Sequence, residues 1–167
     1  MKVTFGGNAV TLYKDVVKVG EKAPNFSAIN NDLKPISLSD FKGKVKLISV
    51  FPSIDTSVCS IQNRRFNKEA GAFGDKVAFI AISNDLPFAL KRFCGAEGIT
   101  NLTTLSDHRD TEFGKKYGFL INELRLLARG VVIIDENDVV QYVELLPEIG
   151  HEPDYDSAIK KLISMIK

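Results

Sequence analysis

The chain has 167 residues, of which 44% are hydrophobic and 26% are charged, and its formal net charge is +1 at pH 7. We expect one domain, residues 1–167, because this length can bury a full hydrophobic core. The balanced charge gives no reason to expect nucleic acid as a partner, and the longest apolar runs are too short to span a membrane. Two cysteines and no signal-peptide pattern favour a reducing, cytoplasmic setting without a structural disulfide framework.

The first half of the chain predicts a hairpin followed by two buried strands with a helix between them. Residues Met1–Tyr13 are expected to form the hairpin, since β-branched and aromatic residues flank a Gly-Gly-Asn turn. The apolar, β-branched runs Val45–Phe51 and Val77–Ser83 are typical of strands. Between them, apolar residues recur three and four positions apart, which predicts a helix that ends at Gly74.

The second half of the chain predicts two helices, a second hairpin and a final helix. A helix is expected from about Pro87 to Ala96, because proline suits the first helical turn, and a short one over Thr111–Tyr117. Strands Val131–Ile134 and Val139–Val143 flank a turn of Asp, Glu and Asn residues. The amphipathic pattern of Pro153–Ile166 predicts the last helix.

This order of elements indicates an α/β thioredoxin-like fold, with an N-terminal β-hairpin and a central mixed sheet flanked by helices. The first two strands are expected to be parallel, joined by a right-handed crossover. In this fold the strand 131–134 runs antiparallel to the strand 45–51. The beginning of strand 131–134 therefore lies near the loop that leads to Cys59. Because Arg129 comes just before this strand, we expect it to lie close to the Cys59 sulfur.

Cys59 is the strongest candidate for chemistry in the chain. The preceding strand stops at Pro52 and a helix begins a few residues later, which places the thiol in the first helical turn. Unpaired backbone N–H groups and the helix dipole favour an anion there, and the thiolate is the nucleophilic form of cysteine. Thr56 can cap the helix and offer its hydroxyl to the site, and Pro52 can shield the sulfur from water. Asp55 is expected to point to solvent or to cap the helix.

Other charged and metal-binding groups give weaker signals. Arg64 and Arg65 lie at helical angles that turn them away from Cys59, so Arg129 is the better cation. His108 and His151 are expected at the surface. The two cysteines lie far apart in the sequence without neighbouring ligands, so we expect no metal and no cofactor.

These residues resemble the peroxiredoxins, whose active-site loop reads Pro-x-x-x-Thr-x-x-Cys and matches Pro52, Thr56 and Cys59. Further segments across nearly the whole chain resemble the bacterial thiol peroxidase subfamily. They are Phe51–Cys59, Asp85–Ala89, Arg92–Gly98, Ala128–Arg129, Val132–Asp138 and Glu152–Tyr155. The apolar segment Leu120–Leu127, which contains Arg125, departs from that likeness.

The resemblance implies a role for each matching residue. Cys59 corresponds to the cysteine that attacks hydrogen peroxide or organic hydroperoxides and becomes a sulfenic acid. Cys94 corresponds to the resolving cysteine of the same chain, which forms a disulfide with it. Thr56 and Arg129 would bind peroxide and thiolate. The resemblance further implies thioredoxin as the reductant and a homodimer.

Two alternatives remain open at the level of the sequence. One is a thiol–disulfide oxidoreductase or redox sensor without peroxidase activity, although the chain lacks the Cys-x-x-Cys motif of thioredoxin-type reductases. The other is a non-catalytic thioredoxin-like binding domain in which both cysteines are structural. Cys94, on an apolar helix face with Leu90 and Phe93, fits a structural role well.

Overall fold

The computed structural model describes residues 2–166, so Met1, the first residue of the expected hairpin, lies outside it. The strands are β1 (Lys2–Phe5), β2 (Asn8–Thr11), β3 (Ser27–Ile29), β4 (Pro35–Ser37), β5 (Val45–Val50), β6 (Val77–Ser83), β7 (Thr103–Ser106), β8 (Gly130–Ile134) and β9 (Val140–Leu145). The helices are α1 (Ser57–Phe73), α2 (Pro87–Glu97), α3 (Glu112–Tyr117) and α4 (Tyr155–Met165), with short 3-10 turns η1 (Leu38–Phe41) and η2 (Gly74–Lys76).

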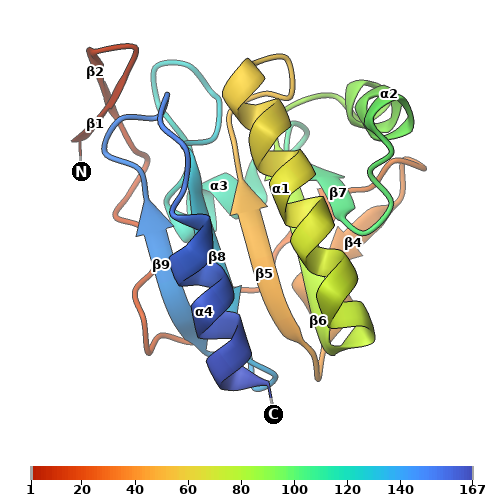
Figure 1. Cartoon of the computed structure of the whole chain (residues 1–167). Coiled ribbons are helices and arrows are strands. Elements are labelled where there is room, and N and C mark those ends of the chain that lie inside the picture. The colour runs from red at the N-terminus through yellow and green to blue at the C-terminus, as the bar shows by residue number, and fades with distance from the viewer. Residues whose placement is uncertain (1, 167) are drawn as a thin grey trace.

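A mixed sheet of seven strands forms the centre of the molecule, in the order β4-β3-β7-β6-β5-β8-β9, while β1 and β2 pair as a separate antiparallel hairpin. Figure 1 shows α1 and α4 lying across one face of the sheet and α3 behind it. This arrangement confirms the predicted α/β fold with its N-terminal hairpin and flanking helices.

Strand β5 lies inside the sheet between β6 and β8, and all of its residues are buried. Leu47 packs with Phe66 and Leu162 in the core under α1 and α4, whereas Ile48 packs with Phe113 in the core on the opposite face. Burial on both faces explains the nearly continuous apolar run in the sequence. Burial of each such side chain contributes about 1.5–3 kcal/mol to the free energy of unfolding. The loop that follows β5 therefore begins at a stable strand.

The pairing of β5 determines where the functional loops meet. It runs parallel to β6, with Val50 opposite Ile82, and antiparallel to β8, with Val50 opposite Gly130. β6 in turn runs parallel to β7. The carboxyl ends of β5, β6 and β7 and the beginning of β8 therefore share one edge of the sheet, as the sequence predicts for β5 and β8.

Three strands of the sheet were missing from the predicted order: β3, β4 and β7. They have three, three and four residues, which is too short for an alternating pattern to stand out. Their extended conformation is decided by pairing with distant strands, as where β3 contacts β7. The last helix is also shorter than predicted, because Asp154 caps it by accepting from the N–H of Ser157 at 3.1 Å.

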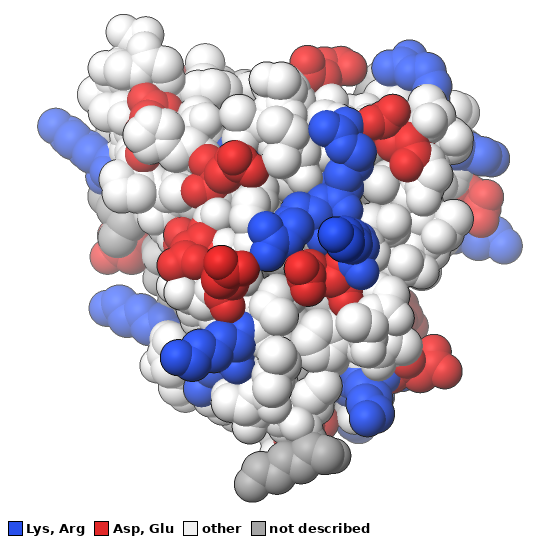
Figure 2. Space-filling view, in the orientation of Figure 1, with Lys and Arg blue, Asp and Glu red and all other residues white. Residues whose placement is uncertain are grey.

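Charges of both signs are mixed over the face that α1 and α4 cover (Figure 2). Arg64 pairs with Glu97 at 2.6 Å, and Arg65 pairs with Asp156 at 2.9 Å. Both arginines thus point outward, which confirms that neither faces Cys59. Within residues 2–166, no helix has the length and apolar character needed to cross a membrane.

Candidate active site

Cys59 lies in the first turn of α1, directly beyond the carboxyl end of β5, and is fully buried. Thr56 is the N-cap residue of the helix: its backbone is extended, and its Oγ1 accepts from the N–H of Cys59 at 3.2 Å. The same hydroxyl donates to the carbonyl of Ser53 at 3.2 Å. The cap therefore fixes the thiol at the positive end of the helix dipole, where an anion is stabilised.

The loop between β5 and α1 is held by a carboxylate that the sequence analysis did not single out for a role. Asp85 accepts from the Ser53 hydroxyl and from the N–H of Ile54, both at 2.9 Å, and from the Ser83 hydroxyl at 2.6 Å. Pro52 is buried within the loop. Asp55 points to solvent as expected, with 76% of its side chain exposed. The loop is thus shaped by contacts from the end of β6.

Arg129 precedes β8 and is buried at 1% exposure. Its Nη1 donates to the side-chain oxygen of Gln62 at 2.8 Å, and its Nε donates to the carbonyl of Ile149 at 2.6 Å. Within residues 2–166, these partners are neutral oxygens and no carboxylate pairs with the guanidinium. A buried charge without an opposite charge nearby costs free energy. An anion placed close to this guanidinium would therefore be stabilised.

Gln62 connects that guanidinium to the helix of the candidate nucleophile. It follows Cys59 by three residues, so the two side chains lie on the same side of α1, one turn apart. It is fully buried, and its amide donates to Ser49 Oγ at 2.7 Å and to the carbonyl of Val50 at 3.2 Å. Sequence reasoning missed Gln62, although a glutamine one helical turn from Cys59 was the signal available.

The second anchor of Arg129, the carbonyl of Ile149, depends on the N-terminal hairpin. The N–H of Ile149 donates to the carbonyl of Thr4 at 2.8 Å. Glu148 accepts from the backbone N–H groups of Gly150 at 2.7 Å and Gly7 at 2.8 Å. These hydrogen bonds lower the pKa of Glu148 to about 2. These hydrogen bonds hold the hairpin against the segment that positions Arg129, and we call them the hairpin latch.

Cys94 lies on α2 and is half-buried, and both cysteines are free thiols. Its sulfur contacts Thr104 Oγ1 at 3.7 Å. Leu90 of α2 belongs to the same apolar cluster as Cys59, and Phe93 packs against that cluster. The two thiols thus belong to adjacent helices without being bonded.

Polar contacts also bridge these two segments at the surface. Asp55 faces Arg92 at 3.9 Å, and Arg64 of α1 binds Glu97 of α2. A cavity of about 400 Å³ lies between the Cys59 turn and α2. Exposed ion pairs of this kind contribute only about 0–1 kcal/mol each, so they hold α2 in place weakly.

The remaining candidates lie away from Cys59 or do not form clusters. His108 and His151 are exposed, as predicted. Among residues 2–166, no group of three potential metal ligands lies close together. In the apolar segment 120–127, Leu120 and Leu127 are buried, whereas Arg125 is exposed. The two ends of that segment therefore pack into the core, whereas residues 122–125 lie at the surface.

Comparisons with known proteins found relatives that match nearly the whole chain. Residues 18–159 match the Redoxin family. The chain is 56% identical to a thiol peroxidase of Halalkalibacterium halodurans, over 95% of each chain, and 51% identical to a thiol peroxidase of Bacillus subtilis, over 99% of each. Among solved structures, a peroxiredoxin-like protein from Aquifex aeolicus superposes with a TM-score of 0.93 at 39% identity, covering 99% of this chain and 97% of the other.

Proposed function

Because the chain belongs to the Redoxin family and is a thiol peroxidase of the peroxiredoxin group, we propose that Cys59 is the residue that reduces the peroxide. The substrates are hydrogen peroxide and organic hydroperoxides. The observation that carries this assignment is the buried thiol in a capped helical turn, linked through Gln62 to a guanidinium with neutral partners. A thiolate at this position would gain both the helix dipole and the charge of Arg129.

In the first step the thiolate sulfur attacks the terminal oxygen of the peroxide. A sulfur–oxygen bond forms as the oxygen–oxygen bond breaks, and Cys59 is oxidised to a sulfenic acid. The leaving hydroxide or alkoxide takes up one proton and departs as water or alcohol. Arg129 stabilises charge on that leaving oxygen, and the Thr56 hydroxyl does so when it turns its proton from the Ser53 carbonyl to the peroxide. The buried Pro52 limits access of water.

In the second step Cys94 attacks the sulfenic sulfur, water leaves and a disulfide forms. A disulfide requires the two Cα atoms to lie within about 7 Å, whereas the two thiols start on separate helices. We therefore expect the first turn of α1, the helix α2, or both to unwind during each cycle. This rearrangement breaks only weak ion pairs, so it costs little free energy. They join Asp55 to Arg92 and Arg64 to Glu97.

The disulfide is then reduced by thiol–disulfide exchange with an external dithiol protein, for which we propose thioredoxin. We also expect a homodimer in a reducing, cytoplasmic setting. Sedimentation of the purified chain tests the dimer, and reduction of the oxidised protein by thioredoxin tests the partner. Reduction by a small dithiol but not by thioredoxin would reject that partner while leaving the peroxidase reaction intact.

Two cysteine variants test the assignment. Cys59→Ser should abolish peroxide consumption, because the nucleophile is gone. Cys94→Ser should complete one turnover with thioredoxin as reductant and then stall as a sulfenic acid, detectable by mass spectrometry. Steady turnover in Cys94→Ser would remove the resolving role, and activity in Cys59→Ser would remove the proposed mechanism. A redox sensor without peroxidase activity would show no peroxide consumption even in the wild type.

A further inference from the structure

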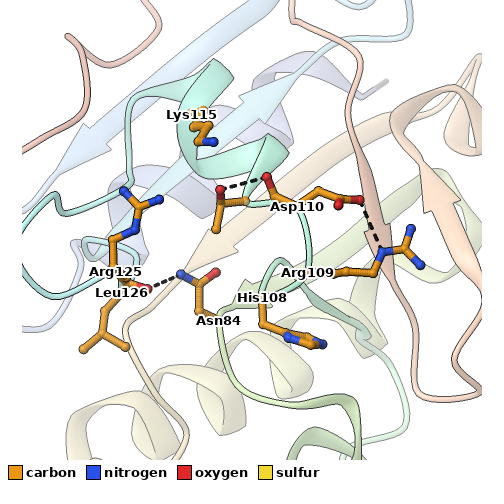
Figure 3. A pocket seen from close by; sticks show the side chains of 8 residues that line it. Asn84, His108, Arg109, Asp110, Lys115, Arg125 and Leu126 are labelled. Atoms are coloured by element: carbon orange, nitrogen blue, oxygen red, sulfur yellow. Dashed lines mark hydrogen bonds and ion pairs between the residues drawn. The ribbon is translucent and has the colours of Figure 1, made fainter.

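A second cavity, of about 410 Å³, opens at the same edge of the sheet as Cys59 but contains none of the residues assigned to peroxide reduction. It is lined by Asn84 after β6, by residues 108–111 after β7, by Lys115 of α3, and by Arg125 and Leu126 of the segment before β8. Figure 3 shows these side chains around the opening. Ligands of open α/β sheets bind at this edge, beyond the carboxyl ends of the strands.

The charge of this cavity is strongly one-sided, although the whole chain carries a net charge of only +1. Among residues 2–166, Arg109, Lys115, Arg125 and His108 line it, against a single carboxylate, Asp110. Arg109 and Asp110 pair with each other at 3.3 Å, so their charges cancel. Lys115 and Arg125 are left as the surplus positive charge.

These two cations have unused hydrogen-bond donors. Within residues 2–166, the Arg125 side chain makes no hydrogen bond or ion pair, and the contact of Lys115 Nζ is with the Tyr13 ring, 5.9 Å from its centroid. Figure 3 shows both groups at the cavity, from different elements of the fold. Guanidinium groups bind carboxylates and phosphates through two parallel hydrogen bonds, and an ammonium group adds a point charge.

The backbone at this cavity is held in unusual conformations. Four non-glycine residues within 2–166 have positive φ, and two of them, Thr111 at 49° and Arg125 at 54°, line the cavity. A positive φ is rare for residues other than glycine, and such strain gathers at functional sites. The N–H of Arg125 donates to Ile121, and its carbonyl accepts from the Asn84 side chain, so the strained residue is fixed in place.

We propose that this cavity binds a small molecule that carries an oxyanion, either a phosphate or a pair of carboxylates. Arg125 and Lys115 hold the anionic group, and the remaining volume accepts the body of the ligand. The cavity falls within the range of roughly 300–1,000 Å³ typical of small-molecule sites, so it exceeds the needs of one inorganic ion.

The position of the cavity links this ligand to the loop of Cys59. Asn84 bonds to the Arg125 backbone, and the next residue, Asp85, holds Ser53 and Ile54 of that loop. A ligand that tightens the Asn84–Arg125 contact therefore acts on a segment directly joined to the active-site loop. Binding of this ligand does not depend on which peroxide the protein reduces.

The test is titration of the full chain with inorganic phosphate, and in parallel with succinate, at constant ionic strength and followed by amide NMR shifts. We expect saturable, one-to-one binding with shifts at Asn84, Thr111 and Arg125. The anion that binds more tightly identifies the ligand as phosphorylated or as a dicarboxylate. The double variant Lys115→Gln, Arg125→Gln should weaken binding by about tenfold or more, as expected when charge-assisted hydrogen bonds are lost.

The matched control removes the same charge elsewhere, from α4, as Lys160→Gln, Lys161→Gln. It should bind both anions as the wild type does. All four replaced residues lie at the surface or are half-buried, and circular dichroism verifies that each variant is folded. Shifts that never saturate, wild-type affinity in the cavity variant, or equal weakening in the control would overturn the proposal.

Discussion

Replacing Gln62 with methionine should weaken both the fold and the peroxidase reaction, because its amide joins Arg129 to strand β5. The glutamine is fully buried and makes three hydrogen bonds through its side chain, to Arg129, to Ser49 and to the carbonyl of Val50. Methionine has a similar volume, so no cavity is created and the effect isolates the polar contacts.

The size of the effect follows from these contacts. The hydrogen bond to the guanidinium is worth about 1.5–3 kcal/mol, and each neutral one about 1 kcal/mol. We therefore expect the free energy of unfolding to fall by about 3.5–5 kcal/mol. Arg129 keeps its bond to Ile149 but loses its tie to α1. A misplaced guanidinium should lower kcat/KM by about ten- to a hundredfold, equivalent to ~1.4–2.8 kcal/mol of transition-state stabilisation.

The assay compares urea unfolding with peroxide consumption under limiting peroxide for three variants. Gln62→Glu keeps an acceptor in place for Arg129 but pairs the guanidinium with a carboxylate, so it should lose at least as much activity as Gln62→Met. Gln141→Met removes an amide that bonds to Asp135, far from Cys59 in the fold, and should leave kcat/KM unchanged. Wild-type kcat/KM in Gln62→Met, or equal loss in Gln62→Met and Gln141→Met, would refute the positioning role of Gln62.

Three further predictions concern the surroundings of the site. Gly130→Ala should lower the free energy of unfolding by about 1–3 kcal/mol in urea melts, because its Cβ would overlap the Glu144 carbonyl oxygen and force β8 and β9 apart; wild-type stability would contradict this. Hydrogen bonds from Gly150 and Gly7 hold the pKa of Glu148 down at about 2, so its carboxylate stabilises the fold above pH 4.5 and this contribution disappears as the pH falls through about 2. The stability difference between wild type and Glu148→Gln should shrink over that window, and a constant difference would argue against the hairpin latch. Thr56→Val should cost about 1 kcal/mol of stability through loss of the cap and should also slow peroxide consumption, whereas an unchanged rate would limit Thr56 to capping.

The elements that the sequence predicted best are those with long, consistent patterns. The runs Val45–Phe51 and Val77–Ser83 became β5 and β6, and the helix expected at Pro87 became α2, each within one residue of its predicted bounds. β3, β4 and β7 were missed because their few residues become strands only through distant partners. Local propensity carries little information where tertiary pairing decides the conformation.

The residues of the candidate site also fall into those that local sequence predicted and those that depend on distant partners. Pro52, Thr56 and Cys59 lie in one short stretch, and the expectation that Arg129 lies near them was drawn from the antiparallel pairing of two strands, which the structure has. Gln62 and Asp85 were missed because their roles depend on partners 67 and 31 residues away. A buried amide or carboxylate looks like an ordinary helix or loop residue until its distant partner is known.

The pairing of Val50 with Gly130 also has a consequence for the newly made protein. On the proposed chemistry, a nascent chain that has not yet been synthesised through β8 carries Cys59 without its guanidinium. The contact between such distant segments is among the slower ones to form during folding. Peroxide reactivity would then arise only when the polypeptide is nearly complete, which protects the thiol from oxidation while it is still on the ribosome.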